Sequence, residues 1–340
     1  MATRIGLMGF GRLGRNIFRI LSARDDVEIA AISDVAEHKA LEYLLRFDTV
    51  LGRFPDEVSI KDGMLRLRGR SIPVLAGRDP GDVQWRDYGA DIVVEATARP
   101  RSREQVQRHL DAGAKRVVLC VPPLDPPDIT VVMGVNEDDL GPSHRIISNA
   151  SCTANCLAPI AKLLHEKAGI RHGFVSTIHA YTNAQRLADV PAGSMRTSRA
   201  AAENIIPADT RAHELVMDLI PELKGRLGGL AMNVPVPDGS VIDFVAALGR
   251  KTTKEEINGM IREAAAKKLK GIVQYETSPI VSSDVIGNPH SAIFDSQGTQ
   301  MLGDDMVKIL AWFDNGWGYS HRVLDVVKRL AAQAEAEVVR

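Results

Sequence analysis

Cys152 lies in the run SNASCTANC, residues 148–156, and its surroundings are those of a candidate nucleophile. Small hydrogen-bonding residues precede it, and an amphipathic segment that includes Leu157, Ile160 and Leu164 follows it. This pattern predicts that a loop becomes a helix at the cysteine. Backbone N–H groups at the start of a helix carry positive partial charge, which stabilises the reactive thiolate over the thiol. The alternative is that Cys152 is simply a small buried apolar side chain.

His179 is a second residue that could take part in such chemistry. It lies near the end of an apolar run, residues 174–180, that predicts a β-strand. A histidine at a strand end can form an ion pair with a thiolate and accept a proton during oxidation of an aldehyde adduct. A strand histidine is also commonly a structural residue, and the spacing alone leaves open whether His179 meets Cys152.

The first residues of the chain indicate a dinucleotide site. A short apolar strand, residues 4–8, runs directly into the motif Gly9-Phe-Gly-Arg-Leu-Gly14, and a helical pattern follows. In this context Gly9 permits a tight turn, Gly11 lets the backbone approach a pyrophosphate, and Gly14 allows close packing of helix on strand. Asp34 ends the second predicted strand, where a carboxylate binds ribose hydroxyls and repels a 2′-phosphate. The pattern therefore favours NAD over NADP.

Composition excludes several other classes of protein. The chain has 340 residues, enough for two domains, with 45% apolar and 25% charged residues. A net charge of −1 provides no basic field for nucleic acid or for an anionic membrane. The sequence shows no signal peptide or apolar span, so we expect a cytoplasmic protein. Three cysteines make no disulfide framework, and no ligand spacing indicates a zinc or other metal site.

The order of predicted elements gives an α/β fold with two parts. Strands and helices alternate up to about residue 150, which predicts a Rossmann-type, doubly wound parallel sheet. From residue 173 longer β-rich runs appear, with helices near 254–269 and from 319 onward, which predicts an α+β domain with a mixed or antiparallel sheet. Thr253 and Glu256 have the spacing of a capping box. The segment 181–208 shows little strand pattern, and internal loops of that length are usually functional.

Five motifs in order resemble the phosphorylating glyceraldehyde-3-phosphate dehydrogenase family: GFGRLGR, SNASCTANCLAP, STIHAYTNAQR, RAAAENIIP and DNGWGYSHRVLD. The resemblance spans essentially the whole chain. It implies a Rossmann domain of residues 1–151 completed by a C-terminal helix, 317–340, and a catalytic domain of residues 152–316. It also implies a cytoplasmic homotetramer in which residues 181–208 form the S-loop that lines a neighbouring cofactor pocket.

The resemblance also implies a reaction and a set of roles. Cys152 would attack the aldehyde of D-glyceraldehyde 3-phosphate, a hydride would pass to NAD while His179 takes the hydroxyl proton, and inorganic phosphate would release 1,3-bisphosphoglycerate from a thioester. The residues that would bind the two phosphate groups are Ser151, Thr153, Thr182, Arg199 and Thr210. The residues that would contact the cofactor are Gly9, Gly11, Arg12, Leu13, Asp34, Arg78 on the adenine side, Thr97, and Cys120 and Asn315 at the nicotinamide.

Departures from the family pattern mark a divergent member. A family arginine that binds phosphate is Asn233 here, within GLAMNVP, and a family glycine is Arg211, within TRAH. An asparagine donates hydrogen bonds without charge, and charge-assisted bonds are about twice as strong. Our hypothesis is that the guanidinium has moved from position 233 to 211; the alternative is that Arg211 points to solvent or to a subunit interface. On the cofactor side the departures are Met8, Ala98, Pro100, Cys120 and Gly316.

Two other functions stay open at this point. One is a sister activity on another phosphorylated aldehyde, such as erythrose 4-phosphate, which Asn233 and Arg211 keep in consideration. The other is a non-catalytic NAD-binding or regulatory protein that has kept the fold. The presence of both Cys152 and His179 counts against a regulator, which has no chemical need of the pair.

Overall fold

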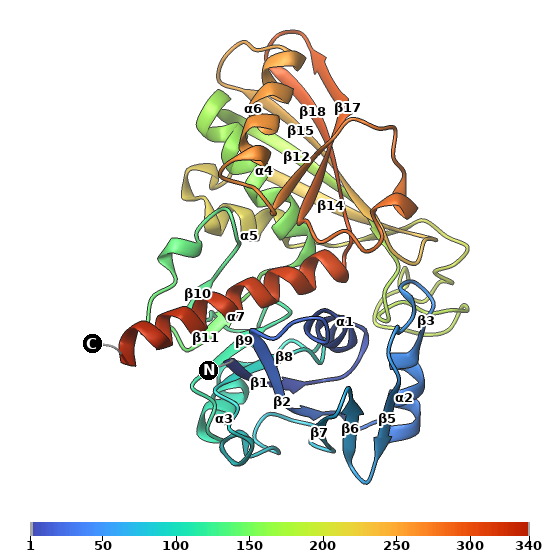
Figure 1. Ribbon diagram of the computed structural model, residues 1–340. Coiled ribbons are helices and arrows are strands. Elements are labelled where there is room, and N and C mark those ends of the chain that lie inside the picture. The colour runs from blue at the N-terminus through green and yellow to red at the C-terminus, as the bar shows by residue number, and fades with distance from the viewer. Residues whose placement is uncertain (1–2, 339–340) are drawn as a thin grey trace. The chain divides into compact units, whose positions relative to one another are not determined.

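The computed structural model describes residues 3–338, and these form two compact units (Figure 1). The first unit contains residues 3–131, 136–150 and 320–338, and the second contains residues 132–135 and 151–319. Residues 132–135, which the sequence assigned to the first domain, therefore group with the second. No helix within residues 3–338 combines the length and the apolar character needed to cross a membrane.

A nine-stranded sheet forms the centre of the first unit, in the order β10-β11-β9-β8-β1-β2-β7-β6-β5. The strands from β10 to β7 are parallel, which confirms the predicted Rossmann-type sheet. The strand bounds are β1 Thr3–Met8, β2 Val27–Ser33, β5 Val58–Lys61, β6 Met64–Leu67, β7 Arg70–Leu75, β8 Ile92–Glu95, β9 Arg116–Leu119, β10 Ile129–Thr130 and β11 Ile146–Ser148.

The antiparallel strands β5 and β6 at one edge were not predicted, although the sequence carries their turn signal. Asp62 and Gly63 join them with φ of 52° and 70°, and Arg68 and Gly69 join β6 to β7 with φ of 47° and 78°. Left-handed pairs of this kind make the two-residue turns whose twist matches a β-hairpin. The dipeptide Asp62-Gly63 therefore marks the hairpin in the sequence.

The helices of the first unit connect the parallel strands. Helix α1 (Arg12–Leu21) joins β1 to β2, and α3 (Arg103–Asp111) joins β8 to β9. The sheet grows in opposite directions from the neighbouring strands β1 and β8, so right-handed crossovers place α1 and α3 on opposite faces, as Figure 1 shows. The carboxyl ends of β1 and β8 therefore form a topological switch point, where ligands of such folds bind.

Shorter elements complete the first unit. They are α2 (His38–Arg46), the small sheet of β3 (Phe47–Asp48) and β4 (Gly52–Arg53), and the 3₁₀ turns η1 (Trp85–Tyr88) and η2 (Glu137–Asp139). The C-terminal helix α7 spans Trp317–Val338 and belongs to this unit from residue 320.

A seven-stranded mixed sheet forms the second unit, in the order β13-β14-β12-β15-β18-β17-β16, which confirms the predicted α+β class. Helices α4, α5 and α6 pack against its strands (Figure 1). The strand bounds are β12 Ile170–Ala180, β13 Ile206–Ala208, β14 Leu227–Val234, β15 Ser240–Leu248, β16 Val273–Glu276, β17 Ala292–Leu302 and β18 Met306–Phe313. The helices are α4 Cys152–Ala168, α5 Ala212–Leu219 and α6 Lys254–Ala266, with 3₁₀ turns η3 Pro221–Leu223 and η4 Ser282–Val285.

Three differences from the sequence prediction have local causes. Strand β17 was not predicted because polar residues fill its middle, where the pairing with β18 shifts register between Asp295 and Gln300. The last residues of the segment 181–208 form β13 instead of loop. The predicted capping box on α6 is half correct: Thr253 accepts the Glu256 N–H at 3.2 Å, but the Glu256 carboxylate accepts bonds from Thr252 and Arg250.

Candidate active site

Cys152 is the first residue of α4, and it is half-buried. Ser151 caps the helix, because its side chain accepts the backbone N–H of Ala154 at 3.1 Å. The N–H groups of the first turn point away from the helix body and carry its positive partial charge. Ala150 precedes the cap with φ of 54°, a left-handed conformation that costs a non-glycine residue about 1–2 kcal/mol. The chain thus turns sharply to bring the thiol to the helix N-terminus.

His179 faces this thiol from the end of β12. Its Nε2 lies 3.5 Å from Cys152 Sγ, and its Nδ1 lies 2.6 Å from the carbonyl oxygen of Ala180. A carbonyl can only accept, so Nδ1 carries a proton and Nε2 is left to interact with sulfur. The ring of Phe313 packs edge-on against the imidazole, with centroids 6.1 Å apart. The structure therefore brings together the two residues whose contact the sequence left open.

The electrostatics of the pair favour charge separation. Burial alone would lower the pKa of His179, but the hydrogen bond and charge of Cys152, the Ala180 carbonyl and Asp238 outweigh it and raise that pKa. Asp238 is itself buried, and its Oδ1 accepts the N–H groups of Gly239 and Asn315. Asp238 is distant from His179 along the chain, and no local pattern in the sequence marks it as a partner of the histidine. The raised pKa of His179 favours the imidazolium, the form that can pair with a thiolate.

The cofactor-side residues of the first unit meet at the switch point of its sheet. Gly9 has φ of 96°, and a Cβ at this position would lie 2.8 Å from the backbone nitrogen of Thr97. A Cβ on Gly14 would lie 2.1 Å from the carbonyl oxygen of Gly9, whereas one on Gly11 would meet no atom within 4 Å. Gly9 and Gly14 thus serve close packing, and Gly11 leaves open space in front of α1.

The residues around this space suit a dinucleotide. Gly11 is the N-cap of α1 and offers no side-chain cap, so N–H groups of Arg12 and Leu13 are oriented to bind an anion. The Asp34 carboxylate accepts the Phe10 N–H at 2.7 Å and the Ala36 N–H at 2.9 Å, which fixes it at the end of β2. Arg78 is exposed after β7.

Cys120 and Asn315, the two residues predicted at the nicotinamide, lie in different units. Cys120 follows β9, is 5% exposed, and has a thiol whose pKa burial raises well above the ordinary value. It therefore stays neutral and is no second nucleophile. Asn315 belongs to the second unit, where its side-chain oxygen accepts a hydrogen bond from Ser240 at 3.1 Å.

Comparisons with known proteins agree with this geometry. The family description "Glyceraldehyde 3-phosphate dehydrogenase, NAD binding domain" matches residues 3–103, and the description of the C-terminal domain matches residues 151–315. The chain belongs to the glyceraldehyde 3-phosphate dehydrogenase family. The glyceraldehyde-3-phosphate dehydrogenase of Geobacillus stearothermophilus is 47% identical over 334 residues, 98% of this chain and 99% of that protein. Glyceraldehyde-3-phosphate dehydrogenase 1 of Bacillus subtilis is 46% identical over 332 residues, 97% and 99% of the two chains. The predicted family and its NAD-binding domain are thereby confirmed.

Within this family member, the predicted phosphate-binding residues lie in several elements of the second unit. Ser151 and Thr153 flank Cys152, and Thr182 follows the end of β12 by two residues. Asn233 lies on β14 in register with His179 on the parallel strand β12. Residues paired in this way project from the same face of a sheet, so the position that departs from the family pattern is the immediate neighbour of the imidazole.

Both predicted phosphate-binding arginines have carboxylate partners. Arg199 Nε lies 3.0 Å from Asp189, and Arg211 Nε lies 2.9 Å from Glu214 at the start of α5. The Arg211 side chain is 70% exposed. The hydroxyl oxygen of Thr210 accepts a hydrogen bond from the backbone N–H of Ala212 at 3.2 Å. The hypothesis of a relocated guanidinium therefore requires that Arg211 exchange Glu214 for a phosphate.

The Cys152–His179 contact predicts how fast the thiol is alkylated. At pH 7 we expect iodoacetamide to modify Cys152 about tenfold more slowly in His179→Asn, because the thiolate loses its cationic partner. The difference should shrink near pH 10, where an ordinary thiol is ionised without help. His172→Asn, an exposed histidine on the same strand, is the matched control. Equal rates in His179→Asn and the wild type at pH 7 would show that the two residues do not act together.

Proposed function

We propose that this chain is an NAD-dependent, phosphorylating glyceraldehyde-3-phosphate dehydrogenase. It oxidises D-glyceraldehyde 3-phosphate, with inorganic phosphate as the second substrate, to 1,3-bisphosphoglycerate. The observation that carries the proposal is the 3.5 Å contact between Cys152 Sγ and His179 Nε2 at a helix N-terminus, in a chain that also has a dinucleotide-binding glycine loop. A regulator that only binds NAD would have no use for a paired thiolate and imidazolium.

The first half of the reaction follows from this pair. The Cys152 thiolate attacks the aldehyde carbon, a C–S bond forms, and the carbonyl oxygen becomes an alkoxide. The His179 imidazolium stabilises this oxygen through Nε2, assisted by backbone N–H groups at the start of α4. His179 gives its Nε2 proton to this oxygen, which becomes the hydroxyl of a thiohemiacetal; when the C–H bond breaks, the now neutral imidazole takes the proton back and a thioester remains. Bound NAD supplies the acceptor of the hydride.

The second half regenerates the nucleophile. A phosphate oxygen attacks the thioester carbon, and the tetrahedral oxyanion has the same donors, the first-turn N–H groups and His179. The C–S bond then breaks and the acyl phosphate leaves. The Cys152 sulfur is released as a thiolate that is already paired with an imidazolium. We propose that Ser151, Thr153, Thr182, Arg199, Thr210, Arg211 and Asn233 bind the two phosphate groups.

For the cofactor, we propose that the first-turn N–H groups of α1 hold the pyrophosphate and that Asp34 holds the ribose hydroxyls next to the adenine. Arg78 and Thr97, at the ends of β7 and β8, bind the adenine side. The NAD preference rests on Asp34, because a carboxylate fixed at this edge of the sheet repels a 2′-phosphate.

The decisive experiment measures NADH formation with glyceraldehyde 3-phosphate, erythrose 4-phosphate and an unphosphorylated aldehyde, each with and without inorganic phosphate. We expect phosphate-dependent turnover that is fastest with glyceraldehyde 3-phosphate and absent in Cys152→Ser. Faster turnover of erythrose 4-phosphate would assign the sister activity. Turnover without phosphate would exclude the phosphorylating mechanism, and absence of turnover with all three aldehydes would exclude an enzyme of this class.

Substitutions at positions 233 and 211 should change the KM for phosphate-bearing substrates in opposite directions. Asn233→Arg places a guanidinium beside His179 and should lower the KM for the phosphorylated aldehyde about fivefold, since a charge-assisted hydrogen bond gains about 1 kcal/mol over a neutral one. Arg211→Gly should raise the KM for inorganic phosphate or the KM for the phosphorylated aldehyde by a similar factor. Asn233→Gln, which keeps the amide and adds no charge, is the control. Unchanged KM values in Arg211→Gly would contradict the relocated guanidinium.

We also propose that copies of this chain assemble into a homotetramer. Phe174 on β12 is 69% exposed and Leu230 on β14 is 44% exposed, and the Phe174 ring lies over Gly228 of the neighbouring strand. The segment 181–208 adds Leu187 and Met195, which are 85% and 90% exposed. Apolar surface of this extent on a sheet and a long loop is typical of a protein interface, and a second copy of the chain is the partner we propose.

Light scattering tests the assembly. The wild type should have the mass of four 37.0 kDa chains, about 148 kDa, whereas Phe174→Glu should shift it to dimers or monomers. Leu124→Glu, which changes an equally exposed residue of the first unit, is the control and should leave the mass unchanged. A monomeric wild type would refute the proposed tetramer.

A further inference from the structure

A buried carboxylate, Glu95, lies at the carboxyl end of the central strand β8 in the first unit. Glu95 is 1% exposed. Its Oε1 accepts the Thr97 backbone N–H at 3.0 Å and also the Thr97 hydroxyl. Its Oε2 lies 3.3 Å from His109 Nε2, and Trp85 donates its indole N–H to His109 Nδ1 at 3.0 Å. Because the indole can only donate, Nε2 carries the imidazole proton and donates it to Glu95.

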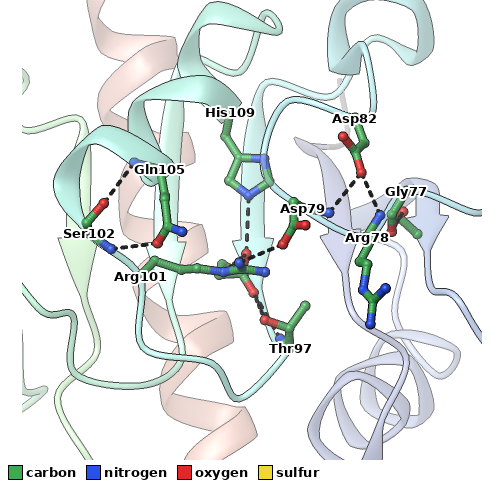
Figure 2. A network of polar contacts seen from close by, with 11 residues as sticks. Gly77, Arg78, Asp79, Asp82, Thr97, Arg101, Ser102, Gln105 and His109 are labelled. Atoms are coloured by element: carbon green, nitrogen blue, oxygen red, sulfur yellow. Dashed lines mark hydrogen bonds and ion pairs between the residues drawn. The ribbon is translucent and has the colours of Figure 1, made fainter.

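Arg101 links this carboxylate to the loop that follows β7. Its Nε lies 3.6 Å from Glu95, and its Nη1 donates to Asp79 Oδ1 at 3.0 Å. Figure 2 shows the Arg101 side chain lying below the His109 ring and extending toward Asp79. Asp79 in turn lies in a tight turn, because Asp82 accepts the backbone N–H groups of Arg78 and Asp79 at 2.9 Å each.

The energetics of this arrangement favour a positioning role. Arg101 is 5% exposed, and its Nη2 is buried without a hydrogen-bond acceptor among residues 3–338. A buried ion pair gains little net stability over apolar packing, and an unsatisfied buried N–H makes the balance worse. Burial would raise the pKa of Glu95, but the bonds from His109 and Thr97 and the charge of Arg101 keep that pKa below its ordinary value. Glu95 is thus charged, and the Arg101 charge is fixed beside it.

We propose that the Glu95–Arg101–Asp79 bridge is a clasp that holds Thr97 and Arg78 in place for the adenine side of NAD. It rests on the cofactor site proposed above, and Arg101 acts in it as a positioning residue, since its buried guanidinium reaches the two strand-end loops and not the ligand. Through Glu95 the clasp orients the Thr97 hydroxyl and N–H. Through Asp79 it fixes the turn from which the exposed Arg78 side chain extends.

The test is a double-mutant cycle on NAD⁺ affinity, measured by titration calorimetry. Arg101→Met should raise the Kd for NAD⁺ and for ADP-ribose about tenfold, because small displacements of positioning groups cost large factors in binding and rate. Asp79→Asn should raise both Kd values severalfold, and the double variant should bind no more weakly than Arg101→Met alone. Arg101→Lys should recover part of the affinity. Arg108→Met, which removes an exposed arginine from α3, is the control.

The reactivity of Cys152 toward iodoacetamide without cofactor should be the same in all variants, which separates a local effect from loss of folding. Asp79 is half exposed, so Asp79→Asn decides the question even if Arg101→Met does not fold. Wild-type Kd values in Asp79→Asn, or additive effects in the double variant, would overturn the clasp while the proposed function stands. A wild-type protein that does not bind NAD⁺ would overturn both.

Discussion

The contact between Cys152 and His179 is the interaction on which the proposed chemistry depends. Neither residue would be charged there alone, since burial opposes the imidazolium and an isolated thiol is mostly protonated at neutral pH. Each charge stabilises the other, and fixed groups support both: the first turn of α4 on the sulfur side, and the Ala180 carbonyl and Asp238 on the imidazole side. The start of one helix and the end of one strand therefore hold the proposed nucleophile and its partner.

The first unit also holds a charged group among fixed partners, at the end of β8. There a charged carboxylate, Glu95, is buried; it accepts hydrogen bonds from Thr97 and His109, and the Arg101 charge lies beside it. In each unit a group with fixed partners lies at the carboxyl end of a strand: Glu95 ends β8, and His179 lies one residue before the end of β12. The difference lies in what the charge does. In our proposals, the charge in the second unit takes part in the reaction, whereas the charge in the first holds the loops around it.

Local signals explain what could be predicted from the sequence. The cysteine at a helix start, the glycine loop and Asp34 are each recognised within a few residues, and the Rossmann-type sheet follows from the alternation of short elements. The contact between residues 152 and 179, and the register of Asn233 with His179, depend on how one helix and two strands pack, which no local pattern encodes. Asp238 and Glu95 were missed for the same reason, because their roles come from burial beside distant residues. The β5–β6 hairpin was missed despite a readable Asp62-Gly63 turn.

The two arginine–carboxylate pairs change how the substitution at position 233 should be understood. If Arg199 and Arg211 bind phosphate as we propose, each must leave the carboxylate with which it is paired, Asp189 or Glu214. These pairs are exposed to water, where ion pairs contribute little to stability. A phosphate dianion carries more charge than one carboxylate and can bind a guanidinium in a bidentate manner, whereas each arginine contacts its carboxylate here through Nε, so the exchange of partners costs little. Under this proposal, substrate affinity depends on how far each arginine side chain must move to reach the phosphate, and less on the number of cations present.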